Sequence, residues 1–320
     1  MKYLKQSLSK ILPIFIIPLL LLSGCVQTTD QTGTVKGSGI VITDFSSSRD
    51  YVEGKDRAVR IYMEVENQGG YATDKVLVCL IGSFGEISES MWKLEDNECQ
   101  KIDRKLEAYD PTTDMPGGTA RKAWTLKSPW VPYPQESDYT FTGRVYYFYR
   151  SMTSTKIKVY SESEIEAARQ RGETLSSVEQ QVKTISPIDI TISAPTLLRA
   201  EDGYFTIRIQ VSNVGGGIVF DHRKIDWNSE TPPSLSIDDL NYIKLNITYP
   251  KNELDMTACE TEIELKKGET RTISCDFEIK DPESITTWKS YPITVEAEYG
   301  YYVDRDLSIT VKGKKGETAK

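Results

Sequence analysis

The sequence predicts an all-β protein: two tandem antiparallel β-sandwiches, joined by a linker with one short helix. Three observations predict this architecture. Apolar and polar residues alternate in many short stretches bounded by turn residues, as half-buried strands require. The same series of strands and turns occurs twice along the 320 residues. Helical periodicity is confined to one short stretch between the two copies. Many short alternating strands with almost no helix are typical of sandwiches.

The N-terminal segment has the pattern of an export signal. Three lysines precede an apolar run at 11–22, which ends in Leu22-Ser23-Gly24-Cys25. The run is short for a membrane span, and small residues before Cys25 suit cleavage. The ending resembles a lipobox, the signal of prokaryotic lipoproteins, which implies cleavage before Cys25 and acylation of its thiol. The alternatives are an uncleaved anchor or an ordinary secretion signal followed by a chance cysteine.

This resemblance implies an extracytoplasmic protein that is lipid-anchored to the cell membrane or envelope through acylated Cys25. Two acyl chains on one sulfur hold a protein stably at a bilayer, where a single chain does not. Residues 25–38 are rich in Thr, Gly and Gln. We expect them to form a flexible tether.

The composition is acidic, with 39 Lys and Arg against 47 Asp and Glu. Removal of the three lysines in residues 1–24 takes the formal net charge from −8 to −11. Such a surface argues against binding to nucleic acid, because phosphates require a basic face. It also argues against lying flat on anionic lipid.

Cysteine usage agrees with export. Acylation of Cys25 leaves four cysteines, which allow three disulfide connectivities. Proximity along the chain favours Cys79–Cys99 and Cys259–Cys275. Each bond closes a loop of roughly 15–20 residues, which stabilises the fold by about 3 kcal/mol in the chain-entropy model. Zinc binding is the rival interpretation, but the chain has no Cys-x2-Cys pair and only one histidine.

The chain contains an internal repeat. Val65-Glu66-Asn67-Gln68-Gly69-Gly70 reappears as Val211-Ser212-Asn213-Val214-Gly215-Gly216, and an alternating apolar strand precedes each copy, at 59–65 and 205–211. Glycine and asparagine suit a tight strand-ending turn. The use of the same motif in both copies favours a structural turn over a ligand-binding loop. The predicted turn residues are Asn67, Gly69, Gly70, Asn213, Gly215 and Gly216.

The ends of the two copies also match. Residues 139–161 align with 291–313 without a gap. We interpret each segment as a closing hairpin, with polar turns at Ser151–Ser154 and Asp304–Asp306.

Between the copies, Ser163-Glu164-Ile165-Glu166 has the pattern of a capping box and Gly172 that of a helix stop. These signals predict one helix of two or three turns in an exposed polar linker. The predicted organisation is a signal peptide at 1–24, a tether at 25–38, a first domain at 39–160, a linker at 161–184, a second domain at 185–313 and a disordered tail at 314–320.

The Val-x-Asn-x-Gly-Gly turn after an early strand resembles the CARDB-type immunoglobulin-like domains of bacterial and archaeal surface proteins. The residues that carry this resemblance are Asn67, Gly69 and Gly70 in one copy, and Asn213, Gly215 and Gly216 in the other. It covers 40–160 and 185–313, and implies a seven-stranded immunoglobulin-like sandwich in each copy with an adhesive or spacer role. The disulfides, the Pro/Trp loop of the first copy and the helix between the copies depart from the simple family pattern.

No catalytic arrangement stands out. The sole histidine, His222, lies near Asp221 and Asp226, but Gly82-Ser83-Phe84-Gly85 only half resembles a nucleophile elbow. Clustered carboxylates leave a glycosidase pair open, although in an acidic protein they are ordinarily solvated. These clusters are Glu95, Asp96 and Glu98; Asp238 and Asp239; and Glu260, Glu262 and Glu264.

Oxygen-rich turns at 110–114 and 304–306 are candidate calcium ligands, but neither approaches an EF-hand loop. Asn246-Ile247-Thr248 is a glycosylation sequon, so Asn246 is a candidate modification site in a host that glycosylates exported asparagines. We expect no enzymatic activity, no metal and no cofactor.

Aromatic residues are the candidate partner contacts. Trp130-Val131-Pro132-Tyr133-Pro134 predicts a rigid apolar loop, and aromatic side chains of this kind lead protein interfaces and stack on sugars. We therefore single out Trp130 and Tyr133. The alternative is that these aromatic residues fill the core or cover sheet edges or the domain junction.

The sequence thus predicts a membrane-anchored, non-enzymatic module for binding, adhesion or envelope structure. Its expected partners are the lipid membrane and an envelope or surface protein or glycan, and not nucleic acid. An accessory subunit of a membrane or S-layer complex and a carbohydrate-binding or carbohydrate-active protein are the alternatives.

Overall fold

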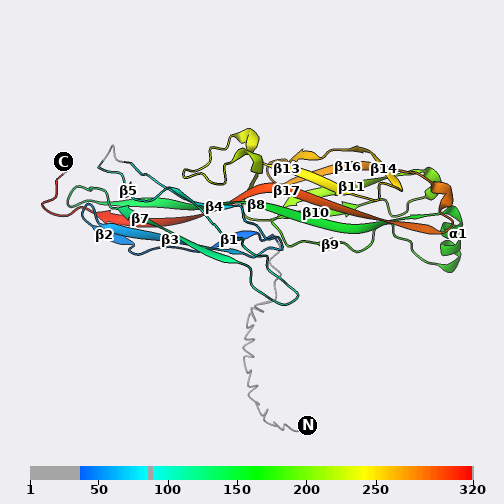
Figure 1. The fold of residues 1–320 in the computed structure, drawn as a ribbon, viewed down its shortest axis with the longest axis horizontal. Helices are drawn as coiled ribbons and strands as arrows, with labels where there is room; N and C mark the ends of the chain where they lie inside the picture. Colours follow the sequence, from blue (N-terminus) through cyan, green and yellow to red (C-terminus); the bar gives the residue numbers. More distant parts are fainter. Residues whose placement is uncertain (1–36, 86–88, 319–320) are drawn as a thin grey trace, which may run out of the picture. The chain divides into compact units, whose positions relative to one another are not determined.

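The computed structural model describes residues 37–85 and 89–318, and most of these are in β-strands, as the sequence predicts (Figure 1). The predicted signal peptide, Cys25 and the tether up to residue 36 lie outside the described residues. The described chain belongs to one compact unit.

The strands form three sheets, antiparallel except where β2 joins. The first sheet has the order β1 (Ile40–Ser47), β3 (Ala58–Asn67), β7 (Thr119–Lys127) and β5 (Lys93–Leu94). The second has the order β10 (Ile188–Ser193), β11 (Tyr204–Asn213), β16 (Thr270–Ile279) and β14 (Leu254–Cys259).

The third sheet runs through both repeats. Its order is β15 (Glu262–Glu264), β13 (Tyr242–Thr248), β17 (Trp288–Lys312), β8 (Glu136–Tyr160), β4 (Val76–Ile81) and β6 (Cys99–Lys101). Three short strands join its sides: β2 (Tyr51–Glu53) and β12 (Ile218–Phe220) pair with β17, and β9 (Val182–Lys183) pairs with β8.

The period-two alternation places the core as predicted. Val59, Ile61, Met63 and Val65 of β3 are all buried, and their neighbours on the strand are more exposed. In the second repeat, Phe205 of β11 stacks on Phe277 of β16 and on Tyr291 of β17, with ring centroids 5.4 and 6.1 Å apart. Each four-stranded sheet therefore packs its apolar face on part of the third sheet. We call these two packed units the first and the second sandwich.

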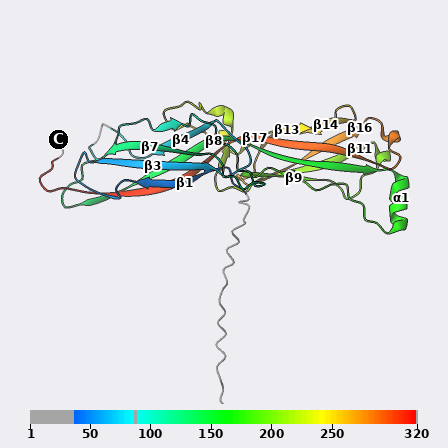
Figure 2. The ribbon, with the colours of Figure 1, turned by 60° about the horizontal axis from the view of Figure 1, so that its bottom comes forward.

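The predicted closing hairpins are wrong. β8 and β17 are each a single strand of 25 residues, and they pair with each other in antiparallel register along their whole length (Figures 1 and 2). The expected turn at 151–154 continues the alternation instead, because Ser151 and Thr153 point into the core. The expected turn at 304–306 lies in the ladder, where Asp304 faces Arg144.

This continuity makes the two sandwiches share strands. The first half of β8 pairs with β4 in the first sandwich, and its second half pairs with β9 in the second. The first half of β17 pairs with β13 in the second sandwich, and its end pairs with β2 in the first. Each sandwich therefore contains one long-strand segment from the other repeat.

The two repeats have equivalent strands. The equivalent pairs, first repeat before second, are β1 and β10, β3 and β11, β7 and β16, β5 and β14, β4 and β13, β6 and β15, and β8 and β17. The repetition seen in the sequence is therefore a repetition of strand order.

The predicted helix is α1 (Glu162–Arg171). Its N-cap is Ser161, whose side chain accepts from the backbone N–H of Glu164, so the cap lies two residues before the expected Ser163. Gly172 ends the helix in the left-handed conformation, as predicted. Four short 3-10 turns complete the helical elements of the described chain: η1 (Ala200–Asp202), η2 (His222–Lys224), η3 (Ile237–Asp239) and η4 (Pro282–Ser284).

Part of the expected exposed linker and part of the expected disordered tail are packed on the sandwiches. Residues 177–183 of the expected linker run along the second half of β8, where the Lys158 N–H donates to the Ser177 carbonyl over 2.8 Å. Residues 314–318, expected to be part of a disordered tail, form a turn on the first sandwich. There the Glu317 carboxylate accepts the backbone N–H of Lys55 over 2.8 Å.

A second apolar cluster covers the opposite face of the third sheet. It is closed by the segment 221–240, which connects β12 to β13. That segment reaches the first repeat, because the Glu230 carbonyl accepts the backbone N–H of Cys99 over 2.9 Å. The buried members of the cluster are Leu77, Cys79, Cys99, Tyr146, Phe220, Ile225 and Tyr302.

Candidate functional site

The Asn-Gly-Gly turn of the first repeat is held from inside the protein. Asn67 is fully buried at the end of β3, and its amide donates to the carbonyls of Tyr71 (2.8 Å) and Leu106 (3.2 Å). Its side-chain oxygen accepts from the Gly69 N–H (3.2 Å) and from the Tyr149 hydroxyl (3.0 Å). All four bonds are internal, which fits a structural turn.

The second repeat makes the same arrangement. The Asn213 amide donates to the carbonyls of Gly217 (3.0 Å) and Gly268 (3.3 Å). Its oxygen accepts from the Gly215 N–H (3.2 Å) and from the Tyr301 hydroxyl (2.8 Å). Tyr301 occupies the position in β17 that Tyr149 occupies in β8.

The first glycine of each turn makes room for that tyrosine. A Cβ atom on Gly69 would overlap the Tyr149 hydroxyl, and one on Gly215 would lie 2.5 Å from the Tyr301 hydroxyl. A Cβ atom on Gly216, the second glycine of its turn, would meet no atom within 4 Å. The motif therefore requires glycine at this position because the turn lies close to a tyrosine of a long strand.

Four buried tyrosines meet where β8 and β17 cross from one sandwich to the other. Tyr147 faces Tyr301 across the ladder with ring centroids 5.6 Å apart, and Tyr149 faces Tyr299 at 6.4 Å. Burial raises the pKa of all four phenols above the ordinary value. We call this group the tyrosine cluster. It holds the junction of the sandwiches as a neutral, packed core.

The two disulfides are the pairs predicted from the sequence. Cys79–Cys99 joins β4 to β6 in the third sheet, and Cys259–Cys275 joins β14 to β16 in the second sheet. The two repeats therefore carry their disulfides at different places in the same strand order.

In the predicted contact loop at 130–134, Trp130 packs on the protein and Tyr133 is exposed to solvent. Trp130 is half-buried, and its ring N–H points to the carbonyl of Glu317 in the C-terminal turn at 3.5 Å. Tyr133 exposes 55% of its surface. Trp130 thus helps to hold the C-terminal turn, and Tyr133 is the aromatic residue of this loop that is available to a partner.

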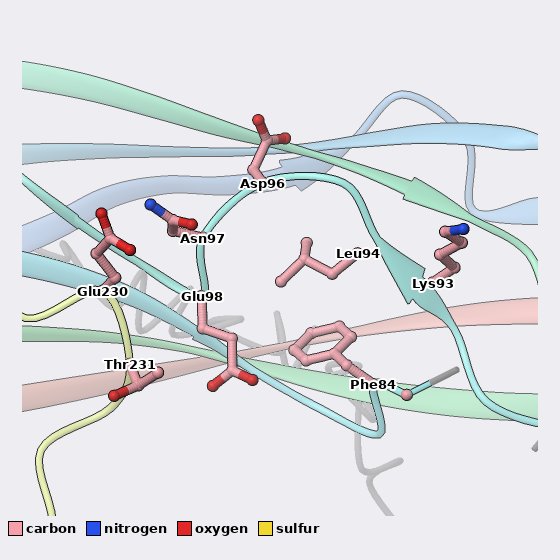
Figure 3. Close-up of a pocket in the computed structure, with 9 residues that line it drawn as sticks. Phe84, Lys93, Leu94, Asp96, Asn97, Glu98, Glu230 and Thr231 are labelled. Atoms are coloured by element: carbon pink, nitrogen blue, oxygen red, sulfur yellow. The ribbon is translucent and has the colours of Figure 1, made fainter. Parts of the chain in front are cut away.

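A shallow depression of about 420 Å³ lies where the segment 221–240 meets the first repeat (Figure 3). Phe84 and Leu94 form its apolar part, and Asp96, Glu98 and Glu230 supply carboxylates. Figure 3 shows the carboxylates of Asp96 and Glu98 pointing away from each other. The Asp96 carboxylate accepts a backbone N–H from β7 over 2.6 Å. Asp96 and Glu98 therefore do not form a pair for acid–base chemistry.

Individual members of the other predicted carboxylate clusters have partners of their own. Asp239 caps η3 through Ser236 at 2.6 Å, and Glu260 pairs with Arg271 at 3.0 Å. Asp304, a candidate calcium ligand, is held by Arg144 at 2.6 Å. Within residues 37–85 and 89–318, no group of three or more His, Cys, Asp or Glu side chains is arranged to hold a metal ion.

His222 packs edge-on against Phe148, with ring centroids 4.8 Å apart. Burial lowers its pKa, and the negative charge of Asp221 opposes that shift. The histidine is therefore part of the packing between the segment 221–240 and β8.

Asn246 lies in the middle of β13 on its exposed side, opposite Glu296 of β17. A glycan on Asn246 would extend away from the core.

Among the described residues, no helix has the length and apolar character needed to cross a lipid bilayer.

Sequence reasoning did not assign the roles of three residues that organise the molecule. Tyr149 and Tyr301 complete the Asn-Gly-Gly turns from 82 and 88 residues away, and Glu317 fastens the C-terminal turn. The matching positions of Tyr149 and Tyr301 in the aligned ends were the available signal for the first two. Glu317 has no local signal, because its partners lie in remote loops.

Comparisons with known proteins leave the family open. No family model matches the chain, and no curated protein matches it. Solved structures that match include Escherichia coli alpha-2-macroglobulin activated by porcine elastase, at 6% sequence identity and a TM-score of 0.20. That match covers 86% of this chain and 32% of the other, so the chain spans about a third of its length. At this level of similarity we draw neither fold nor function from it.

Proposed function

We propose that the protein is an extracytoplasmic lipoprotein that displays two immunoglobulin-like, CARDB-like sandwiches as a non-enzymatic module for binding, adhesion or envelope structure. The observation that carries this proposal is the pair of disulfides within a fully sheet-built scaffold. Structural disulfides persist in oxidising compartments outside the cytoplasm. The lipobox-like sequence that ends in Cys25 supplies the anchor.

The start of the described chain supports display away from a surface. Gly37 lies against Val214 of the second repeat, and the following residue, Ser38, is buried beside Gly69. The chain therefore enters the folded part at the junction of the sandwiches. An anchored tether that enters there leaves the far ends of both sandwiches free to meet partners.

The surface available to a partner includes the Trp130 loop. Tyr133 is held on a segment whose other aromatic residue, Trp130, is fixed by the C-terminal turn. A rigid, exposed tyrosine contributes contact area at low entropic cost.

The anchor is tested by replacing Cys25 with serine. We expect the wild-type chain to be in the membrane fraction with a diacylglycerol mass on its N-terminal peptide, and Cys25→Ser to lose that mass. An unmodified Cys25 on a released wild-type protein would overturn the anchor.

The contact surface is tested by cross-linking on intact cells with Tyr133→Ala. Tyr204→Ala is the matched control, because Tyr204 is an exposed tyrosine (65%) of the other repeat. We expect Tyr133→Ala alone to lose a cross-linked partner. A glycan array with the purified protein separates sugar binding from protein binding.

A further inference from the structure

The closing strand of each sandwich belongs to the other repeat. In the first sandwich, residues 142–147 of β8 have β4 on one side and residues 301–306 of β17 on the other. In the second sandwich, residues 294–298 of β17 have β13 on one side and residues 150–154 of β8 on the other.

The segments exchanged in this way are counterparts in sequence. Residues 139–161 align with 291–313 without a gap, so residues 302–312 correspond to 150–160. If β8 folded back on itself as a hairpin, 150–160 would occupy the place in the first sandwich that 302–312 occupies. The strand that completes each sandwich is thus the counterpart of a segment in its own repeat, but it comes from the other repeat.

We propose that the protein is a strand-exchanged pair within one chain, in which each repeat is the binding partner of the other. The two repeats stay associated even when the linker between them is cut. Exchange of an identical element between two protomers is a known route to stable dimers. Here both protomers are encoded in one polypeptide. This inference does not depend on the proposed function.

The exchanged strands are fastened by side chains as well as by the ladder. Arg144 binds Asp304 with two bonds of 2.6 and 2.7 Å, and the Thr310 hydroxyl donates to Asp138 over 2.6 Å. In the second sandwich, Ser151 and Tyr299 share a hydrogen bond of 2.7 Å. Each of these pairs joins one repeat to the other.

The linker that joins the two repeats stays with the second sandwich. After α1, the chain turns back and runs along the second half of β8, so it stays with the second sandwich. Each disulfide closes a loop within one repeat. A cut in the exposed loop at Glu173–Thr174 therefore leaves two fragments with no covalent bond between them.

The first test is to insert a short protease site between Glu173 and Thr174 and to cleave the folded full-length chain. We expect the two fragments to elute together from gel filtration at the size of the uncut protein. They should separate only in denaturant, even without a reducing agent. Fragments that separate under native conditions would overturn the proposal.

A second test uses the uncut chain, and so does not depend on the insertion. Asp138 faces Thr310 in the ladder, and the counterpart of Thr310 in the first repeat is Lys158. We expect a short bifunctional maleimide to link Asp138→Cys to Thr310→Cys, and to fail with the matched pair Asp138→Cys and Lys158→Cys. Thr310 and Lys158 are both half-buried, so their reactivity is comparable. Linkage in the control pair alone, identified by mass spectrometry, would show closed hairpins and overturn the proposal.

Discussion

The two repeats share their strand order and the contacts at their junction, and they differ at their periphery. Both fasten an Asn-Gly-Gly turn to a tyrosine of a long strand, Asn67 to Tyr149 and Asn213 to Tyr301. Both contribute two rings to the tyrosine cluster. These shared features lie where the strands pass from one sandwich to the other. Both repeats therefore stabilise the junction with the same contacts.

The peripheral features are specific to each repeat. The disulfide joins β4 to β6 in the first repeat and β14 to β16 in the second. The open edge of β1 is capped by Arg305, which donates to the carbonyls of Ile42 and Thr43 at 3.2 Å. The matching edge of β10 is capped by the Gln181 amide, which pairs with Ile192. Different residues thus protect the edge strand of each repeat, whereas the junction uses the same residue types in both repeats.

Alkaline pH is expected to have the largest effect, because it acts on the shared junction. Burial raises the pKa of the four tyrosines above the ordinary 10.0. A raised pKa in the folded state means that these neutral phenols stabilise the fold fully below pH 10, and that this stability is lost as the pH rises further. We expect circular dichroism and tyrosinate absorbance to change together in one transition. Two separate transitions would show that the repeats unfold independently.

Removal of each disulfide tests the peripheral difference. Cys79→Ala with Cys99→Ala, and Cys259→Ala with Cys275→Ala, should each lower the free energy of unfolding by about 3 kcal/mol, because the closed loops are similar in length. The first pair should cost about 1 kcal/mol more, since both its sulfurs are buried in the second apolar cluster. Denaturant titration measures both, and an equal or reversed order would contradict the role given to that cluster.

A glycine pair tests the close approach at the junction. Gly69→Ala places a methyl group on the Tyr149 hydroxyl and near the Ser38 carbonyl, so we expect a loss of about 3 kcal/mol. Gly216→Ala is the matched control and should change stability by less than about 0.5 kcal/mol, because its new methyl group meets nothing. Equal effects of the two changes would show that the tyrosine does not limit the turn.

The turn asparagines should show the smallest difference. Asn67→Ala removes the acceptor of the buried Tyr149 hydroxyl and the amide donor to the Tyr71 and Leu106 carbonyls, at a cost of about 2 kcal/mol. Asn213 is partly exposed, so water can replace its bonds and the cost of Asn213→Ala should be about 1 kcal/mol. Thermal unfolding of the two variants gives the comparison, and a larger loss for Asn213→Ala would contradict it.

Local signals in the sequence were sufficient for the burial pattern of the strands, the helix stop and the disulfides, but not for the length of β8 and β17. Alternation in β3 placed Val59 and Ile61 in the core, since side chains on a strand point to opposite faces in turn. Gly172 ends α1 because glycine adopts the left-handed conformation without strain. Cys79 and Cys99 pair because short loops bring them together on adjacent strands.

The tertiary structure alone decided the path of β8 and β17. Alternation has the same period in two hairpin arms as in one long strand, so the pattern at 139–161 could not distinguish them. Which strand lies beside β8 depends on packing against residues as far away as Tyr301 and Asp304. The sequence by itself thus determined which residues face a core. The tertiary structure determined which sandwich each half of β8 and β17 completes, because strand pairing is a non-local contact.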